Sequence, residues 1–473
     1  MRLIFVQPAV GHRRDGGYPR GWLMEPLSLA TLAGLCPPDV EKCFFDDRLE
    51  DIDFGMPADA VLLPVETYTA RRSYEIASAF RERGVPVIAG GFHATLMPDE
   101  VGRYAEAVVV GEAEGVFDEL LDDLRHRTLR PRYAGIASAG ELPAVLADRS
   151  LYRGRRYLSV RLLEAARGCG NVCDFCAIHA FYGKRRRRRP LETVLSELRS
   201  LPPRALKFFV DDNFTADPAA TKELLRAMIP LRCRWVTQMS IHAAHDEELL
   251  DLLHRAGCVG VLVGFESLEV ETLRRMGKTF NSMRGGYEVA LDNLRRHRIA
   301  VYATFVFGYD SDKPQVFEEV FDFAMRQEFY VAAFNHLIPF PGTPLHARLE
   351  QEGRLFSSAW WLDPAYRFGM VPFAPLNISA HELTEKCQDL RRRFYSLRRI
   401  LARCNRWNCG GGYLGRNFLP VNLLQRFEVG RRTGFPLGRE GRTEPLLCVN
   451  GEREEFHTPA RSGWEGGGGA AGV

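Results

Sequence analysis

The sequence lacks any apolar run that approaches the roughly 18 residues of a membrane-spanning helix. It begins MRLIFVQPAV, where one basic residue precedes a short apolar run and no small-residue cleavage site follows. We therefore interpret this start as a first strand and not as a signal peptide. Both absences lead us to expect a soluble, cytoplasmic protein, while contact with a lipid substrate at a membrane surface stays open.

The chain also lacks a strong charge bias. Its net charge of +3 gives no global reason to expect a nucleic-acid partner. Hydrophobic residues at 46% and charged residues at 26% exclude wholesale disorder, and 473 residues indicate two or three domains. The local exception is the unbroken arginine run 185–189, which we interpret as a solvated face opening a helix in preference to an anion or nucleic-acid site.

Cysteine is scarce, with 11 residues in the whole chain. Only Cys169, Cys173 and Cys176 lie close together in sequence. In a reducing compartment such a group indicates metal or redox chemistry and not a disulfide framework. Cys404 and Cys409 have no neighbouring cysteines, so we do not assign them to a second cluster.

The first third alternates short apolar runs with stretches of helical spacing. The predicted strands are 3–7, 60–65, 85–89 and 107–110, and the predicted helices are 27–35 and 72–83. Continuous apolar strands separated by amphipathic helices indicate a parallel sheet that is covered on both faces. We predict a doubly wound (Rossmann-like) α/β domain over residues 1–133, with ligand-binding glycines just past its strand ends, and a linker over 134–157.

A second series of strands and helices begins at residue 158. The predicted strands are 158–165, 205–210, 234–239, 259–265, 300–307 and 331–338, and the predicted helices are 191–201, 219–228, 246–256 and 286–296. About six repeats of one unit predict a partial (β/α)6 TIM-like barrel over 158–365, with its site at the carboxyl ends of the strands.

Beyond residue 366 the composition becomes rich in arginine. Residues 381–404 predict one long amphipathic helix, and we expect a mostly helical region over 366–461 that closes the barrel. The glycine-rich end, 462–473, predicts disorder.

The three clustered cysteines have the spacing C-x3-C-x2-C. Three thiolates on one short loop can each reach a different iron of a cuboidal cluster, and the fourth iron then stays open for a substrate. A structural zinc site usually has two C-x2-C pairs, and no second pair follows here. His179 would be needed to complete a zinc site, and we regard that alternative as the weaker one.

This loop resembles the motif of the radical S-adenosylmethionine superfamily, including an aromatic residue, Phe175, before the third cysteine. The resemblance extends over residues 158–350 through polar and glycine-containing segments that follow successive predicted strands. These segments are Asp211-Asp212-Asn213, Gly264-Phe265-Glu266-Ser267, Phe307-Gly308 and Pro339–Pro344. Taken without the resemblance, Asp211-Asp212-Asn213 is equally typical of turn and cap chemistry.

The resemblance implies a [4Fe–4S] cluster, S-adenosylmethionine and an electron donor such as a flavodoxin or ferredoxin. The implied reaction is reductive cleavage of the cofactor to a 5′-deoxyadenosyl radical, which abstracts hydrogen from an unactivated carbon. The implied metal ligands are Cys169, Cys173 and Cys176. The implied S-adenosylmethionine contacts are Phe175, Asp212, Asn213, Gln238, Glu266 and Ser267.

The first domain is similar to the cobalamin-binding domain that precedes many radical enzymes. The resemblance rests on Pro86–Thr95 and Val110–Gly115, and the implied cobalamin contacts are Thr67, Gly90, Gly91, Phe92, His93, Gly111 and Glu112. Pro64 replaces a usual serine, and the Asp-x-His-x-x-Gly signature is absent around His12. The resemblance therefore implies either cobalamin held without a histidine ligand or a vestigial pocket.

The leading hypothesis is a cobalamin-dependent radical methyltransferase that acts on a small molecule or lipid. The alternatives are a radical cyclase, oxidase or rearrangement enzyme, a nucleic-acid methylthiotransferase, and a non-catalytic sensor. Methylthiotransferases carry three cluster cysteines in an N-terminal domain, whereas this N-terminal third offers only Cys36 and Cys43. The sequence does not indicate the substrate, the carbon attacked or the oligomeric state.

Overall fold

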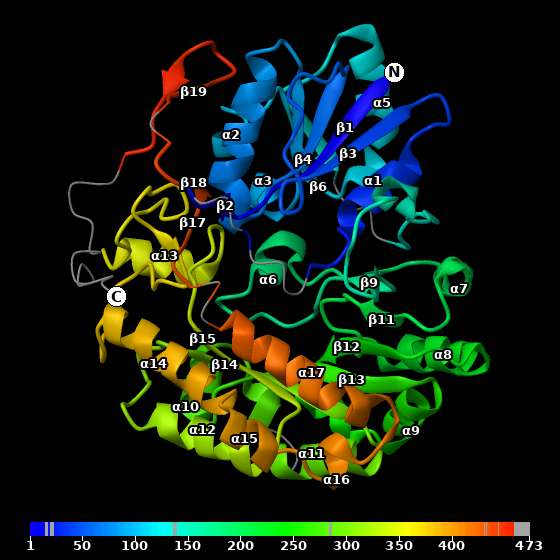
Figure 1. The fold of residues 1–473 in the computed structure, drawn as a ribbon, viewed down its shortest axis with the longest axis vertical. Helices are drawn as coiled ribbons and strands as arrows, with labels where there is room; N and C mark the ends of the chain where they lie inside the picture. Colours follow the sequence, from blue (N-terminus) through cyan, green and yellow to red (C-terminus); the bar gives the residue numbers. More distant parts are fainter. Residues whose placement is uncertain are drawn as a thin grey trace.

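Two six-stranded parallel sheets form the framework of the protein (Figure 1). The computed structural model describes residues 1–14, 18, 23–135, 140–282, 286–429, 431, 433–442 and 444–457. No helix in these ranges is long and apolar enough to cross a membrane.

The first sheet has the strand order β3-β1-β4-β5-β6-β7, and every neighbouring pair is parallel. Its strands are β1 (Arg2–Gln7), β3 (Glu41–Asp46), β4 (Ala60–Pro64), β5 (Val87–Gly90), β6 (Ala107–Gly111) and β7 (Arg132–Gly135). One face packs on α2 (Ala70–Arg81), and the other packs on α1 (Leu27–Leu35) and α5 (Phe117–His126). Coverage of both faces explains why the central strands are continuously apolar.

The second sheet keeps its strands in chain order, β8-β11-β12-β13-β14-β15, again all parallel. They are β8 (Val160–Leu163), β11 (Leu206–Phe209), β12 (Trp235–Met239), β13 (Cys258–Glu266), β14 (Ala300–Phe307) and β15 (Val331–His336). The connecting helices include α7 (Leu191–Ser200), α8 (Pro218–Met228), α9 (Glu247–Arg255), α11 (Gly286–Arg296) and α12 (Val316–Arg326). All carboxyl ends therefore lie along one edge of this sheet.

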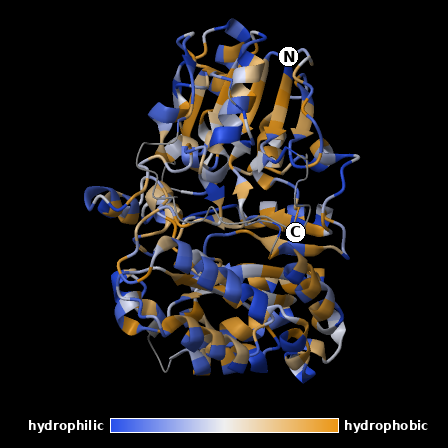
Figure 2. Ribbon diagram, turned by 60° about the vertical axis from the view of Figure 1, so that its left-hand side comes forward, coloured by the Kyte–Doolittle hydropathy of each residue, from blue (hydrophilic) through white to orange (hydrophobic). Residues whose placement is uncertain are grey.

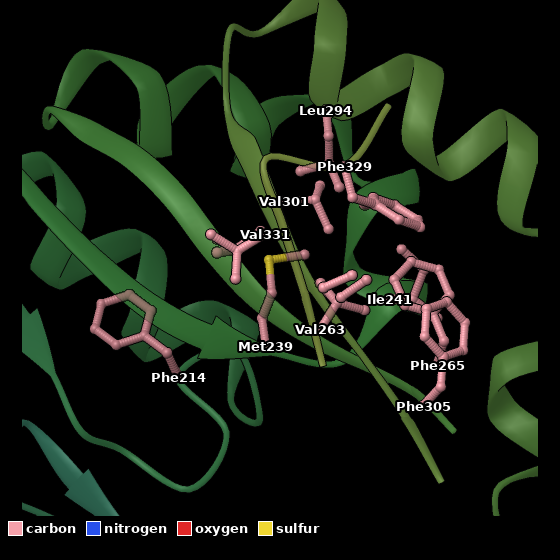
Figure 3. Close-up of a cluster of buried hydrophobic side chains, with 14 of the residues drawn as sticks. Phe214, Met239, Ile241, Val263, Phe265, Leu294, Val301, Phe305, Phe329 and Val331 are labelled. Carbon is pink, nitrogen blue, oxygen red and sulfur yellow. The ribbon is translucent and has the colours of Figure 1, made fainter. Parts of the chain in front are cut away.

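The second sheet and its helices share the largest apolar core. Figure 3 shows Met239, Val263 and Phe305, from three successive strands, among the side chains that fill it. The hydropathy colouring in Figure 2 shows apolar strands inside both halves of the molecule and more polar outer helices. Burial of the apolar side chains therefore positions the strands. The polar residues lie at the strand ends.

Two predictions about local structure were wrong. The helix predicted over 381–404 is broken into α14 (Ala380–Phe394) and α15 (Leu397–Ala402), because the backbone is extended at Ser396. Helix α14 lies along the edge strand β15, where Arg391 Nε donates to the carbonyl of Phe334 at 2.8 Å. Two further helices follow, α16 (Arg406–Cys409) and α17 (Gly412–Glu428), and a disulfide joins Cys404 to Cys409.

The chain does not stay helical to residue 461. After α17 it forms four short strands, β17 (Phe435–Pro436), β18 (Gly438–Arg439), β19 (Leu446–Leu447) and β20 (Arg453–Glu454). Strand β18 pairs with β2 (Gly11–His12), and Leu446 is buried in the core between the first sheet and α2. This part of the chain returns to the first sheet, a long-range contact that no local pattern encodes. The glycine-rich end predicted to be disordered lies outside the described residues.

The predicted linker is held by charged contacts. Within it, η3 (Arg149–Tyr152) carries Arg149, whose guanidinium is paired with the buried carboxylates of Glu25 and Glu197. Because Glu25 precedes α1 and Glu197 lies on α7, these ion pairs connect the two halves of the protein.

Candidate active site

The three clustered cysteines lie on a loop between β9 (Ala166–Arg167) and α6 (Ala177–Tyr182). Gly168 opens this loop with φ +84°, and a Cβ there would lie 2.1 Å from the carbonyl oxygen of Arg185. Only glycine fits this close approach, because both the backbone angle and the space exclude a side chain. The loop therefore leaves the sheet at a fixed point.

Carboxylates that follow β11 fix the start of the loop. Asp212 Oδ2 accepts a hydrogen bond from the Gly168 N–H at 2.7 Å, and Asp211 accepts from the N–H groups of Ala165 and Ala166 at 3.0 and 2.7 Å. The structure thus brings Asp212 to the cysteine loop, where its carboxylate accepts a hydrogen bond from a backbone N–H group.

Other contacts fix the far side of the loop. The Asp174 N–H donates to the carbonyl of Met276 at 3.2 Å, and Tyr309 OH donates to Asp174 Oδ1 at 2.5 Å. The rings of Phe175 and Tyr309 meet edge-on with centroids 6.4 Å apart. Strand ends β13 and β14 therefore support the loop opposite the end of β11, and sequence reasoning had missed Tyr309 and Asp174.

The cysteines themselves are free thiols in the described part of the chain, and Cys173 is buried. Burial raises the pKa of Cys173 to about 12, although the nearby charge of Lys278 favours its thiolate. The Asn213 side-chain amide points its Nδ2 toward Cys169 Sγ at 3.8 Å. A positive metal centre would offset the cost of a buried thiolate here.

Glu266 and Lys278 form a charged pair at the end of β13. The register of β13 shifts between Gly264 and Glu266, and Glu266 has φ +62°. The carboxylate of Glu266 lies 2.7 Å from Lys278 Nζ, in space that a Cβ at Gly264 would occupy. A bulge of this kind redirects a side chain at a strand end. No sequence signal distinguished Lys278.

The remaining predicted S-adenosylmethionine contacts lie at neighbouring strand ends. Gln238, on β12, donates from Nε2 to the carbonyl of Asp211 at 2.7 Å. Ser267 is buried, and its Oγ accepts from the Glu269 N–H at 3.0 Å. The structure brings all the predicted residues to one edge of the sheet, but both of these side chains already have protein partners.

The arginine run does not open a helix. Arg187 and Arg188 form β10, which pairs antiparallel with β9 beside the cysteine loop. Arg187 is paired with Glu112 from the first sheet, and Arg189 lies 2.6 Å from Glu197. The interpretation as a solvated face was therefore wrong for these two side chains.

Glu112, predicted to contact cobalamin, joins the two sheets. Its buried carboxylate lies 3.0 Å from Arg167 Nη1 and also contacts Arg187. Arg167 is further paired with Glu114 at 2.6 Å. Burial disfavours the charged form of Glu114, but the Arg167 cation holds its pKa below the ordinary value.

Thr67 and His93, two further predicted cobalamin contacts, bond to each other beneath the sheet edge. His93 is fully buried, with Nδ1 3.2 Å from Thr67 Oγ1 and Nε2 3.0 Å from Glu100 Oε1. Because both ring nitrogens have partners, His93 is not placed to bind a metal. Its role in this structure is to hold the loop that follows β5.

Phe92 and the predicted glycines lie at the edge of the first sheet that faces the cysteine loop. The Phe92 ring packs at a tilt of 37° against Phe181 of α6, with centroids 4.6 Å apart. Gly91 and Gly111 have positive φ and sit close to neighbouring backbone. A Cβ at Gly90 would meet only Val109, at 3.7 Å. A small side chain at Gly90 would therefore make only ordinary contacts, unlike one at Gly91 or Gly111.

Comparison with known proteins identifies this arrangement. The Radical SAM superfamily matches residues 163–324, the part that carries the cysteine loop and four of the supporting strand ends. Bacteriochlorophyllide d C-12(1)-methyltransferase of Chlorobaculum tepidum is 30% identical, over 81% of this chain and 85% of that relative. The chain belongs to the radical S-adenosylmethionine superfamily. It is a radical S-adenosylmethionine enzyme.

Two further comparisons cover most of the chain. Bacteriochlorophyllide d C-8(2)-methyltransferase, also of Chlorobaculum tepidum, is 25% identical over 71% of this chain and 78% of that relative. The structure of the radical S-adenosylmethionine methyltransferase TsrM from Kitasatospora setae, with cobalamin and a [4Fe–4S] cluster bound, gives a TM-score of 0.59. It is 20% identical and covers 74% of this chain and 75% of that one, so the two chains share a fold.

The donor set fits the cluster that the superfamily implies. In the described residues no three histidine, cysteine or acidic side chains converge on a single ion. A cuboidal cluster does not require such convergence, because each thiolate binds a different iron. Cys169, Cys173 and Cys176 would hold three irons, and the polar ends of β11, β12 and β13 lie at the same edge of the sheet as the cysteine loop.

Proposed function

We propose that this radical S-adenosylmethionine enzyme is a cobalamin-dependent methyltransferase that acts on a tetrapyrrole of the bacteriochlorophyllide type. The substrate class is supported by the two bacteriochlorophyllide methyltransferases, the first of which matches over most of its length. In this proposal residues 1–133 form a Rossmann-like cobalamin-binding domain, and residues 158–365 form a partial (β/α)6 TIM-like barrel.

The observation that carries the proposal is direct contact between the carboxyl edge of the first sheet and the cysteine loop. The Phe92 ring packs on α6, which follows the third cysteine, and Glu112 is paired with Arg167, two residues before the first. In doubly wound sheets ligands bind at this edge. A cobalamin bound there would therefore face the cluster, as transfer between two cofactors requires.

The residues of the chain would divide the work as follows. The three cysteines would hold the cluster, Glu266 would bind the ribose of S-adenosylmethionine, and Gly90 would leave room for the corrin. When bound, the cofactors would supply a hydrogen-abstracting radical and a transferable methyl group. With His93 engaged on both nitrogens, cobalamin would be held without that histidine as a ligand.

The test uses the full-length enzyme reconstituted with iron, sulfide and cobalamin, together with a flavodoxin reducing system. It is supplied with bacteriochlorophyllide d and S-adenosylmethionine deuterated in its methyl group. We expect deuterated methyl groups in the pigment, detected by mass spectrometry. A Cys173→Ser variant is the matched control and should give none, because one cluster ligand is lost.

Two results would contradict the proposal in different ways. Formation of 5′-deoxyadenosine that depends on the pigment, without label in the product, would point to ring closure, oxidation or rearrangement. If enzyme prepared without cobalamin formed labelled product at an undiminished rate, cobalamin would take no part in the reaction.

A further inference from the structure

The segment 397–427 has an unusual charge composition for a protein with almost balanced charge. It contains six arginines and no aspartate, glutamate or lysine; the arginines are Arg398, Arg399, Arg403, Arg406, Arg416 and Arg426. Arg403 is fully buried, and the other five are exposed. None of the six forms an ion pair with an acidic residue in the described part of the chain.

The same segment exposes large apolar side chains. Half of the large apolar residues that are exposed in the described chain lie in it: Leu397, Leu401, Trp407, Leu419, Leu423 and Phe427. Trp407 and Phe427 are the two aromatic members of the exposed set, with 50% and 63% of their surface accessible. Apolar groups gathered in this way typically mark an interaction surface.

Helix α17 presents three of these residues on one face. Leu419, Leu423 and Phe427 repeat every four residues and are exposed, whereas Phe418, Asn422 and Glu428 are buried. The helix is therefore inverted relative to an ordinary surface helix, with apolar residues outward and two polar residues inward. Leu397 and Leu401 repeat the same outward spacing on α15.

Buried polar contacts hold the two helices together. The Arg403 guanidinium donates to the side chain of Asn422 on α17 at 3.0 Å and to the carbonyl of Phe394 on α14 at 3.1 Å. Its carbon centre lies 3.8 Å from the centre of the Phe394 ring. Figure 1 shows α15 and α17 in front of the lower half of the molecule. The exposed residues are therefore carried by a supported scaffold.

We propose that residues 397–427 form a docking surface for an anionic lipid bilayer. Leucine, tryptophan and phenylalanine insert to the depth of the headgroups, and the exposed arginines contact lipid phosphates. We call these residues the lipid-docking surface. The five exposed arginines favour this occupant, because anionic headgroups complement a segment that contributes no acidic residue.

A second copy of the chain fits this surface less well. In a two-fold symmetric dimer the surface would meet itself, so that arginines would face arginines without an acidic partner. A nucleic acid would satisfy the arginines, but it offers no apolar environment to the leucines. The experiments that follow distinguish a lipid bilayer from a second copy of the chain and from a nucleic acid.

The experiment measures partition of the full-length protein onto vesicles by co-sedimentation. Vesicles contain either phosphatidylcholine alone or equal parts of phosphatidylcholine and phosphatidylglycerol. We expect binding to the anionic vesicles that weakens as salt is raised, and little binding to the neutral ones. Absence of binding to the anionic vesicles would overturn the proposal.

Two variants test the two components of the surface. Replacement of Arg398, Arg406 and Arg416 by glutamine should lower the partition coefficient roughly 100-fold, since each basic residue near an anionic leaflet contributes about fivefold. Replacement of Leu419, Leu423 and Phe427 by serine should abolish stable binding to the anionic vesicles. The residues are exposed, so the fold should be kept, and cluster content and circular dichroism report on it.

Matched controls change the same residue types elsewhere on the surface. Arg153, Arg156 and Arg204 are exposed arginines outside the segment, and Leu146, Leu376 and Val449 are exposed apolar residues outside it. Their glutamine and serine replacements should bind vesicles like the unmodified chain. Equal losses in the control and test variants would contradict a localised surface.

Trp407 gives a direct readout of insertion that does not depend on a loss of binding. Lipids that carry a quencher near the headgroup should lower the fluorescence of the bound protein, and the Trp407→Phe variant should lose that decrease. Binding to transfer RNA that depends on the three arginines, without insertion of Trp407, would assign the surface to nucleic acid instead. A concentration-dependent dimer abolished by the serine variant would assign it to a second copy.

Discussion

Asn213 shows how one side chain at a strand end can orient a neighbouring thiol. Its Oδ1 accepts from Thr215 Oγ1 at 3.2 Å and from the Ser240 N–H at 3.3 Å. Its Nδ2 donates to Ser240 Oγ at 3.1 Å and also lies 3.8 Å from Cys169 Sγ. An N–H directed at a cluster sulfur stabilises negative charge there and tunes the reduction potential. The contact to the methionine moiety of S-adenosylmethionine that the sequence suggests for Asn213 stays a prediction.

At the same scale we predict that Glu266→Gln weakens S-adenosylmethionine binding by about 10- to 100-fold, because a ribose hydroxyl loses a charge-assisted partner. Glutamine keeps the size of the side chain at a position with φ +62°. Equilibrium dialysis of the reconstituted enzyme measures the affinity, and iron analysis shows whether the cluster is kept. Glu271→Gln, which changes an exposed carboxylate paired with Arg274, should have no effect.

At the scale of secondary-structure elements, the end of β5 separates two kinds of glycine. At Gly91, φ is +102° and a Cβ would lie 3.0 Å from the carbonyl oxygen of Val65, whereas at Gly90 a Cβ would meet only Val109. The first glycine is required by the loop itself. At the second, a Cβ would make only ordinary van der Waals contact, so the fold does not require glycine there.

We therefore predict different outcomes for the two positions. Gly90→Leu should leave the stability of the chain almost unchanged but prevent cobalamin binding, because its side chain occupies the proposed site. Gly91→Ala should lower the free energy of unfolding by about 1–3 kcal/mol through backbone strain. Absorbance of cobalamin that co-elutes in gel filtration and urea unfolding measure the two effects. Normal cobalamin uptake by Gly90→Leu would place the ligand elsewhere.

Helix α2 is attached to the first sheet by a buried ion pair. Asp47, which follows β3, accepts from Arg72 Nε and Nη2 at 2.8 Å each, and lies 3.0 Å from His12 Nε2. Burial by itself raises the pKa of Asp47, but the bonds from Arg72 and His12 outweigh it and hold that pKa well below the ordinary value of 3.8. The charged form is therefore the stable one in the fold.

The downward shift of the Asp47 pKa determines how the stability of an Asp47→Asn variant depends on pH. A lowered pKa contributes stability that is complete above the unfolded value of 3.8 and is lost as the pH falls through the folded value. Asp47→Asn should cost about 3–5 kcal/mol, since Arg72 keeps a buried charge with one partner fewer. Urea unfolding should show the full difference at pH 5 and a smaller one as the pH falls below the unfolded pKa of 3.8. A difference that grows below pH 5 would contradict this account.

At the scale of the whole molecule, the two sheets are connected by buried charges around the cysteine loop. Glu112 of the first sheet meets Arg167 and Arg187, and Arg149 meets Glu25 and Glu197. Residues 435–457 return to the first sheet, where the Leu447 N–H donates to Ser78 Oγ on α2 at 2.9 Å. The relative position of the two halves is therefore set by several separate segments.

We predict that Glu112→Gln loosens this connection locally, because the Arg167 and Arg187 cations lose a buried counter-charge. Hydrogen exchange should increase in the loop after β6 and in the cysteine loop, with little change in α9. Glu247→Gln is the matched control, since it breaks exposed ion pairs with Arg296 and His297 and should leave exchange unchanged at both loops. Equal exchange in Glu112→Gln and the unmodified chain would show that other contacts suffice.

The amino-acid sequence by itself determined the strand series and the position of the cysteine loop. Predicted strand 300–307 is β14, and predicted helix 27–35 is α1, because apolar periodicity follows directly from burial. Strands β3 and β7 escaped prediction, since they lie at the sheet edges and carry exposed residues. The family followed from three thiols at a spacing that few other chemistries require.

Only the tertiary structure decided which polar side chains remain available at the site. His93 and Glu112 carry no sequence signal that distinguishes a ligand contact from a structural one. Glu100 follows His93 by 7 residues, whereas Arg167, the partner of Glu112, is 55 residues away. Lys278 likewise acquires its position only when the loop after α10 (Val270–Arg275) folds back onto Glu266. Pairing of charges across long sequence distances depends on packing, and local periodicity does not encode it.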